Sequence, residues 1–208
     1  MLIHCIRHGQ STSNAEGRVQ GQLDVPLSDL GLRQSEAVAQ ALAGLPVDAL
    51  YSSPLRRAME TAELLAARLH LPIRTDPRLM EIHAGVFQGQ RRSDLRTHYP
   101  EELARWQSED LDYRIPGGES RRDLIERGSE AFRTIATAGH DQAVIVAHGR
   151  LLIVTLKNLL GWAPDEPPFA LHNGSITTVH FREGRFFPVA IDQIDHLAGV
   201  GLGSQGDL

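Results

Sequence analysis

Two hydrophobic periods alternate along this 208-residue chain and predict strands and helices in turn. Short apolar runs are typical of buried strands, and they occur at residues 2–6, 49–52, 72–75 and 143–147. Between and after them, apolar residues recur at helical spacing over 30–42, 55–69 and 151–160. Two final runs, 175–181 and 186–191, flank Glu183-Gly184 and predict an antiparallel hairpin. This order predicts an α/β fold, a three-layer αβα sandwich whose mixed sheet is mostly parallel and ends in a C-terminal hairpin.

Capping residues locate the helix boundaries. Ser28 is placed to cap a helix that ends at Gly44, and Ser53 with Pro54 predicts the start of another. Ser120 precedes a further helix, and Asp123 is positioned to complete a capping box. Gly161 is expected to end the helix that begins near residue 151, and shorter helices are predicted at 94–98 and 101–107. The polar stretch 10–26 is longer than a simple connection, so we expect it to be functional.

No linker or internal repeat divides the chain. We therefore expect a single domain over residues 1–195 and a glycine-rich tail over 196–208. The tail has glycines at four positions between 199 and 206, which predicts a mobile end.

Charge and composition exclude several classes of protein. The net charge is −5, whereas proteins that bind nucleic acid or a membrane surface need a clustered basic excess. No apolar run is long enough to cross a bilayer, and no signal peptide is evident, so we expect a cytoplasmic protein. Cys5 is the only cysteine, and its place within a strand predicts a buried, unreactive thiol.

The candidate chemistry lies where two apolar strands end. Arg7-His8-Gly9 follows the first strand, and His148-Gly149 follows the strand at 143–147. The carboxyl edge of such a sheet is where α/β proteins bind ligands. One guanidinium and two imidazoles at this edge predict a site for an anion and a nitrogen nucleophile.

A metal site is not expected, although the chain has ten histidines. Neither a His-x-His nor a His-Glu-x-x-His spacing occurs, and no cofactor motif was found. His4 shares a strand face with Ile6 and is expected to be a hydrogen-bonded structural residue.

Six motifs together resemble the signature of the histidine phosphatase superfamily, which includes the cofactor-dependent phosphoglycerate mutases. The resemblance covers roughly residues 1 to 181. The motifs are, in order, Arg7-His8-Gly9-Gln10-Ser11 with Asn14; residues 20–28; Ser52–Ala58 with Thr61; Leu79-Met80-Glu81 with Gly85 and Gly89; Pro116–Ser120; and Val146–Gly149. Gln10 and Gln88 stand where many relatives carry glutamate.

The chemistry of phosphate transfer assigns candidate roles together with the resemblance. Arginine binds two phosphate oxygens at once and stays charged, which suits Arg7 and Arg57. Helix starts at Ser53-Pro54 and after Gly149 are expected to add positive charge. The resemblance implies that His8 takes the phosphoryl group and that Glu81 is the general acid. It also implies a phosphate-binding set of Arg7, Asn14, Gln20, Gly21, Arg57, His148 and Gly149.

Three functions are consistent with these motifs. The first is a metal-independent phosphatase acting on a small phosphorylated metabolite, as the small bacterial members do. The second is a phosphoglycerate mutase, which the short interval of 67 residues between Glu81 and His148 (148 − 81) disfavours. The third is a binding protein without catalysis, which the complete set of catalytic groups disfavours. The sequence leaves open whether the protein is a monomer or a homodimer.

The rest of the substrate must be recognised outside the phosphate pocket. Candidates that offer cationic or hydrogen-bonding groups are His83, the Arg91–Arg96 segment, the Pro116–Arg122 turn and the tail near His196. Because these segments supply no aromatic platform, they favour a substrate with a carboxylate or hydroxyls.

Overall fold

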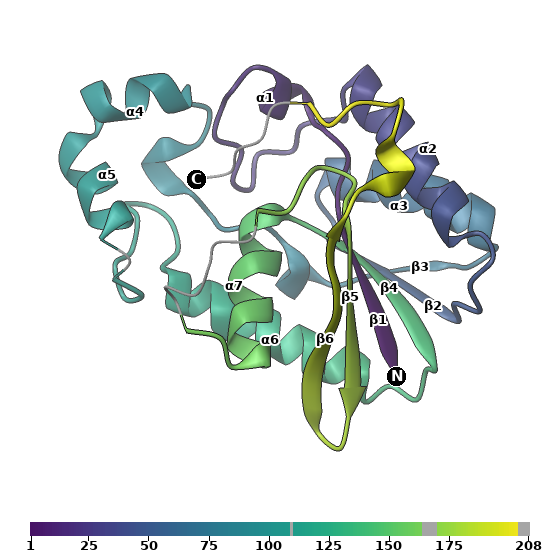
Figure 1. Cartoon of the computed structure of the whole chain (residues 1–208). Coiled ribbons are helices and arrows are strands. Elements are labelled where there is room, and N and C mark those ends of the chain that lie inside the picture. Colours follow the sequence, from purple (N-terminus) through teal and green to yellow (C-terminus); the bar gives the residue numbers. More distant parts are fainter. Residues whose placement is uncertain (109, 164–169, 204–208) are drawn as a thin grey trace.

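A mixed sheet forms the centre of the computed structural model, which describes residues 1–108, 110–163 and 170–203 (Figure 1). Over these residues the strand order is β3-β2-β4-β1-β5-β6. The strands are β1 (Leu2–Arg7), β2 (Ala49–Ser52), β3 (Ile73–Thr75), β4 (Gln142–Ala147), β5 (Ile176–Arg182) and β6 (Arg185–Gln193). Strands β3, β2, β4 and β1 are parallel, whereas β5 and β6 are antiparallel. The predicted mixed sheet and its C-terminal hairpin are confirmed.

Helices cover both faces of this sheet (Figure 1). On one face α2 (Asp29–Leu42) and α3 (Arg56–Leu69) pack against Val144 and Val146 of β4. On the other face α6 (Arg121–Ala136) and α7 (Gly149–Leu160) pack against Ile145. Successive side chains of a strand point to opposite faces, so one continuous apolar run supplies both halves of the core. The predicted three-layer sandwich is confirmed.

Shorter elements surround one end of the sheet. They are α1 (Thr12–Ala15), α4 (Arg92–His98), α5 (Pro100–Gln107) and the single turns η1 (Pro77–Leu79), η2 (Gly85–Phe87) and η3 (Asp195–Leu197). Helices α4 and α5 confirm the predicted short helices. Helix α1 was not predicted, because its four residues lie in the polar loop. Its cap explains it: the Ser11 side chain accepts from Asn14 N–H, while the Asn14 side chain accepts from Ser11 N–H.

Strands β1 and β4 are neighbours, and Arg7 pairs with Ala147 in their parallel register. The residues that follow, His8 and His148, therefore emerge side by side at the carboxyl edge. The loop after β1 also passes unusually close to α2. A Cβ atom on Gly31 would lie 2.0 Å from the Gln10 carbonyl oxygen, so only glycine permits this approach.

Two helices begin at other residues than the sequence predicted. Helix α3 starts at Arg56 with Leu55 as its N-cap, not at Ser53-Pro54. The Ser53 hydroxyl instead lies 2.7 Å from Nε2 of His148, which diverts it from capping. Helix α7 starts at Gly149, two residues earlier than expected, and α2 ends at Leu42 and not at Gly44.

The other caps agree with the prediction. The Ser28 side chain accepts from Gly31 N–H, and Ser120 and Asp123 form the full capping box. The hairpin turn at Glu183-Gly184 has two positive φ angles, 51° and 74°, as tight two-residue turns require.

The beginning of the C-terminal tail packs on the domain. Leu197 is buried, and the Gln34 side-chain amide donates to the Gly201 carbonyl oxygen at 2.9 Å. Of the stretch predicted to be mobile, residues 199–203 are exposed or half-buried, and 204–206 lie outside the described residues.

Buried polar side chains within the sheet are hydrogen-bonded. His4 contacts the Thr178 hydroxyl through Nδ1 (3.0 Å) and the Gln142 side chain through Nε2 (3.2 Å), which confirms its structural role. Cys5 is buried as predicted, and burial raises the pKa of its thiol. No helix in the described part of the chain is long and apolar enough to cross a membrane.

Candidate active site

His8 lies at the centre of the site, immediately after β1, and is 1% exposed. Its Nδ1 atom lies 2.7 Å from the Gly9 carbonyl oxygen, which can only accept a hydrogen bond. Nδ1 therefore carries the proton of the neutral ring, and the lone pair is on Nε2. That atom faces Nε of Arg57 at 3.2 Å. The backbone thus sets the tautomer that leaves Nε2 nucleophilic.

The electrostatics of the site keep both histidines neutral. Burial holds the pKa of His8 well below its usual range, and the charges of Arg57 and Arg7 lower it further. The pKa of His148 is also far below its usual range, mainly because of burial and then because of Arg57. A neutral imidazole can attack phosphorus, whereas a protonated one cannot.

Arg57 connects His8 to the loop after α1. It comes from the first turn of α3 and is fully buried. Its Nη1 donates to the Leu23 carbonyl oxygen at 2.9 Å, and its Nη2 donates to the Gly21 carbonyl oxygen at 2.7 Å. Arg7 is also buried and donates from Nη1 to the Leu171 carbonyl oxygen. Arg57 therefore lies at the nucleophilic edge of His8, and the charge of Arg7 also acts on the ring.

His148 stands opposite His8, with 5.1 Å between ring centroids. It is the N-cap residue of α7 and is fully buried. The Ser53 hydroxyl accepts the Leu55 N–H at 3.3 Å and can donate its own proton to Nε2 of His148, 2.7 Å away. In that tautomer the ring proton is on Nδ1, which has no hydrogen-bond partner among the residues the structure describes. A buried donor of this kind is suited to an anion.

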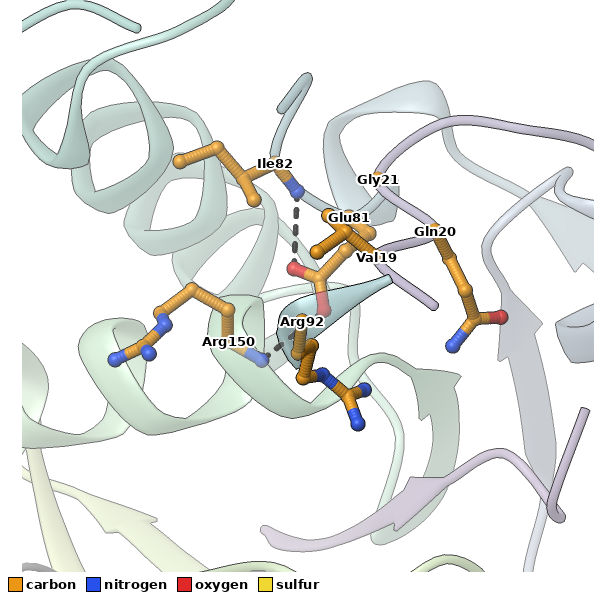
Figure 2. A pocket seen from close by; sticks show the side chains of 7 residues that line it. All are labelled: Val19, Gln20, Gly21, Glu81, Ile82, Arg92 and Arg150. Carbon is orange, nitrogen blue, oxygen red and sulfur yellow. Dashed lines mark hydrogen bonds between the residues drawn. The ribbon is translucent and has the colours of Figure 1, made fainter. Parts of the chain in front are cut away.

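Glu81 lies between η1 and η2, and its carboxylate meets the first turn of α7. Oε1 accepts from the N–H groups of Ile82 (2.9 Å) and Leu151 (3.0 Å). Oε2 accepts from Arg150 N–H at 3.1 Å, as Figure 2 shows. A carboxyl oxygen can take up and release a proton, as a general acid must.

The two helix starts that were expected to attract phosphate bind carboxylates of the chain. The N–H groups of α7 bind Glu81, and the Arg56 N–H of α3 donates to the Asp24 side chain at 2.7 Å. Side chains compete for these donors because helix N-termini favour any nearby negative charge.

A cavity of about 20 Å³ opens beside Glu81 (Figure 2). Its lining residues are Val19, Gln20, Gly21, Glu81, Ile82, Arg92 and Arg150. Gly21 has a φ of +52°, and a Cβ atom there would lie 2.4 Å from the Gln88 side-chain oxygen. Glycine is therefore required where the backbone forms this wall.

The remaining predicted phosphate ligands surround the same edge. Asn14 is buried in the α1 capping box, and Gln20 accepts the Ser11 hydroxyl proton at 2.6 Å. Gly149 is the first residue of α7 and is buried. The Asn173 side-chain amide donates to the His8 carbonyl oxygen at 3.0 Å. Sequence reasoning missed Asn173, although Asn-Gly before the hairpin is a turn signal.

The predicted substrate-recognition segments separate into three groups. Arg92 lines the cavity, and Arg150, which the sequence analysis did not single out, does so as well. His83 lies two residues beyond Glu81, and its Nδ1 accepts Gly85 N–H at 3.2 Å.

Other members of those segments are engaged elsewhere. Arg122 pairs with the exposed Asp112 side chain. His196 contacts the Gly174 carbonyl oxygen at 2.8 Å and does not line the cavity. Arg121 stacks over Trp106 with 4.0 Å between its guanidinium carbon and the ring centroid. In the part of the chain that the structure describes, no group of three or more His, Cys, Asp or Glu side chains is arranged to hold a metal ion.

Comparison with known proteins gives a consistent result. The family model described as histidine phosphatase superfamily (branch 1) matches residues 3–193. A glucosyl-3-phosphoglycerate phosphatase from Mycolicibacterium vanbaalenii is 39% identical over 171 residues, which cover 78% of this chain and 76% of that protein. A metal-independent phosphoserine phosphatase from Arabidopsis thaliana is 33% identical and covers 98% of this chain and 86% of its own length.

Two further matches extend this result. A probable phosphoglycerate mutase from Proteus mirabilis is 35% identical, with 97% of each chain covered. The solved structure of Bacillus stearothermophilus YhfR superimposes with a TM-score of 0.88 at 27% identity, covering 94% of this chain and 98% of that one.

Proposed function

The chain belongs to the histidine phosphatase superfamily and is a phosphomonoester hydrolase, and from this premise we propose that it hydrolyses small anionic metabolites through a phosphohistidine on His8, without a metal ion. The proposal depends on the state of the Nε2 atom of His8. It is unprotonated, belongs to a ring whose pKa is lowered, and faces the Arg57 guanidinium at 3.2 Å.

In the first step the Nε2 lone pair forms a bond to phosphorus, and the bond from phosphorus to the ester oxygen breaks. The electron pair goes to the departing oxygen, which takes a proton from Glu81. In the second step Glu81 removes a proton from water, the water oxygen attacks phosphorus, and the electron pair returns to Nε2. The balance is ester and water giving alcohol and inorganic phosphate.

The charge of the phosphate is met by the buried cations and donors. Arg57 exchanges its bond to His8 for a bond to a phosphate oxygen, which frees the lone pair as the substrate arrives. Arg7 adds a second guanidinium, and His148 donates from Nδ1, which lacks a partner within the described structure. Arginine can neutralise the phosphate in place of a metal cation, because it stays charged and binds two oxygens at once.

Glu81 is placed to exchange a proton at Oε2. The backbone N–H groups of Ile82, Leu151 and Arg150 hold the carboxylate in place. As negative charge builds on the departing oxygen, a proton on Oε2 becomes the donor, and the same atom later accepts the proton of water.

Support for this substrate class comes from Arg92 and Arg150, which line the small cavity beside Glu81. These two residues bring positive charge to the side of the site from which the alcohol departs. A second anionic group on the substrate, such as a carboxylate, satisfies this charge. The names of two relatives, a phosphoserine phosphatase and a glucosyl-3-phosphoglycerate phosphatase, denote substrates of this type for those proteins.

A mutase is the second candidate, because a probable phosphoglycerate mutase matches over 97% of both chains. A relative of the same length means that the short interval between Glu81 and His148 does not separate the two reactions. What separates them is the acceptor of the phosphoryl group, which is water in one case and a second hydroxyl in the other.

An assay of product formation tests the proposal. With a chelator present, p-nitrophenyl phosphate should be hydrolysed at an undiminished rate. With 3-phosphoglycerate and catalytic 2,3-bisphosphoglycerate, inorganic phosphate should form faster than 2-phosphoglycerate. Activity that disappears in chelator and returns with magnesium would overturn the metal-independent reaction, and isomerisation faster than phosphate release would make the protein a mutase.

A further inference from the structure

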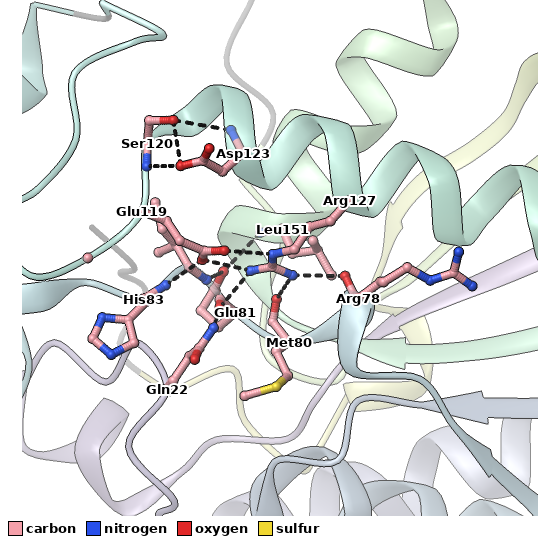
Figure 3. Close-up of polar contacts among 12 residues, drawn as sticks. Gln22, Arg78, Met80, Glu81, His83, Glu119, Ser120, Asp123, Arg127 and Leu151 are labelled. Atoms are coloured by element: carbon pink, nitrogen blue, oxygen red, sulfur yellow. Dashed lines mark hydrogen bonds and ion pairs between the residues drawn. The ribbon is translucent and has the colours of Figure 1, made fainter.

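An ion pair that takes no part in the proposed reaction contacts the backbone of the segment around Glu81. The Nε atom of Arg127 lies 3.0 Å from Oε1 of Glu119, and its Nη2 lies 3.0 Å from Oε2 (Figure 3). This fork-to-fork geometry is the strongest that an arginine and a carboxylate can form. The two side chains are only 18% and 21% exposed. Glu119 belongs to the Pro116–Ser120 motif, for which the sequence analysis found no role in the reaction.

Arg127 also donates hydrogen bonds to the backbone of the segment that carries Glu81. Nη1 donates to the carbonyl oxygens of Arg78 (2.8 Å) and Met80 (2.5 Å), and Nη2 donates to that of Glu81 at 2.9 Å. Residues 80–84 belong to neither a helix nor a strand. No ladder of backbone hydrogen bonds therefore fixes this segment, and one guanidinium binds two of its carbonyl groups, those of Met80 and Glu81, together with that of Arg78 just before it (Figure 3).

Glu119 holds the same segment from its far end. Its Oε2 accepts the His83 N–H at 2.8 Å, and its own N–H donates to the His83 carbonyl oxygen at 2.9 Å. The glycine before it makes this approach possible, because a Cβ atom on Gly118 would lie 2.2 Å from the His83 carbonyl oxygen. The Gln22 side chain adds a bond to the Glu81 carbonyl oxygen at 2.9 Å.

We propose that Glu119 is a positioning residue for the reaction: with Arg127, it fixes the backbone of residues 78–83 so that the Glu81 carboxyl faces the departing oxygen. The proposal rests on the proposed role of Glu81 as general acid. Glu119 is not among the residues that line the cavity beside Glu81. Its effect is on the angle and distance of proton transfer, to which rates are sensitive at the scale of 1 Å.

Substrates whose leaving groups differ in their need for a proton distinguish the two possible roles of Glu119. Loss of a positioning residue should lower kcat/KM most where the acid is most needed, whereas loss of a structural residue should lower all values equally. A nitrophenolate departs without a proton, a phenolate departs less readily, and an alkoxide needs the acid most. The experiment measures kcat/KM for p-nitrophenyl phosphate, phenyl phosphate and glycerol 3-phosphate. This ratio reports the steps up to alcohol release, so hydrolysis of the phosphohistidine does not enter it. Glu81→Gln serves as the reference for loss of the acid.

Asp123→Asn is the matched control. Asp123 is a carboxylate on the same turn, but it binds Ser120 and Arg114 and has no contact with residues 78–83 among its hydrogen bonds. Like Glu119→Gln, the Asp123→Asn variant removes one negative charge near Arg127, and it also weakens the cap of α6. We expect it to lower thermal stability while leaving the ratio of the three kcat/KM values unchanged.

Glu119→Gln should reproduce the pattern of Glu81→Gln in weaker form. We expect kcat/KM to fall by up to roughly a hundredfold for glycerol 3-phosphate, less for phenyl phosphate and least for p-nitrophenyl phosphate. Arg127→Lys keeps the charge but cannot bind three carbonyl groups and a carboxylate at once, so it should show the same selectivity. It also provides the test if Glu119→Gln does not fold.

The two proposals can fail separately. If Glu81→Gln discriminates between the leaving groups but folded Glu119→Gln and Arg127→Lys lower all three values equally, the positioning role is wrong. If Glu81→Gln itself does not discriminate, the general-acid role is wrong, and the positioning role is overturned with it.

Discussion

The Nε2 atom of His148 lies 2.7 Å from the Oγ atom of Ser53, the residue that follows β2. The Ser53 oxygen also accepts a backbone N–H, and its proton can be donated to His148. In that arrangement the hydroxyl holds His148 in the tautomer that leaves a donor on Nδ1. A residue expected to begin a helix acts instead on the orientation of a proton in the site.

Replacing Ser53 by alanine should weaken catalysis without abolishing it. The lost hydrogen bond leaves His148 free to take the other tautomer, at a cost of about 1 kcal/mol, which is roughly a five- to tenfold decrease in kcat/KM. Steady-state kinetics with p-nitrophenyl phosphate measures this. The control is Ser52→Ala, because the Ser52 hydroxyl donates to the Ser53 carbonyl oxygen and not to His148. Equal losses in the two variants would contradict the assigned tautomer.

Acid should destabilise the fold through the two buried histidines. Both have a folded-state pKa well below the ordinary value of 6.5. Below pH 6.5 the unfolded chain therefore takes up protons that the folded chain does not, and stability decreases as pH falls. Each histidine contributes about 1.4 kcal/mol per pH unit in this window.

Denaturant unfolding between pH 7 and pH 5 measures this effect. His148→Asn should reduce the pH dependence by about the share of one histidine. The control is Ser35→Ala, which removes a buried hydroxyl that does not titrate in this range. A His148→Asn variant with the same pH dependence as the unchanged protein would mean that His148 is protonated in the folded state.

Arg92 should affect specificity for a substrate with a second anionic group. We expect Arg92→Ala to raise the KM for phosphoserine about tenfold, the effect of losing one charge-assisted hydrogen bond, and to leave that for p-nitrophenyl phosphate nearly unchanged. The neighbouring Arg91 is exposed and does not line the cavity, so Arg91→Ala is the matched control. Equal effects on both substrates would show that Arg92 does not distinguish the second anionic group.

Hydrophobic periods were sufficient to predict the layers of the fold. Strand β4 illustrates why, since its apolar run fits only a strand covered on both faces. The capping box at Ser120 was predictable because both of its bonds are local. Ser53 was not, because a contact to His148, 95 residues away, competes with the local cap. Capping rules, which consider only neighbouring residues, fail where a side chain contacts a distant residue of the active site.

The sequence motifs predicted the histidines of the site, but they did not predict the residues that hold the site in place. The sequence predicted His8 and His148 at the ends of two strands, and the structure shows that these strands are parallel neighbours, which brings the two rings together. Arg150 and Asn173 were missed because they act through positions that only the folded chain creates. The function of Glu119 likewise depends on Arg127, which no sequence spacing connects to Glu81.

The central claim is that His8 carries the phosphoryl group. The most direct test is rapid quenching of turnover with a phosphate-labelled ester, followed by mapping of the labelled residue. We predict an acid-labile, base-stable label on His8 that forms before inorganic phosphate is released and is absent from His8→Ala. Full turnover by His8→Ala, or a label on another residue that forms and decays at the turnover rate, would contradict it.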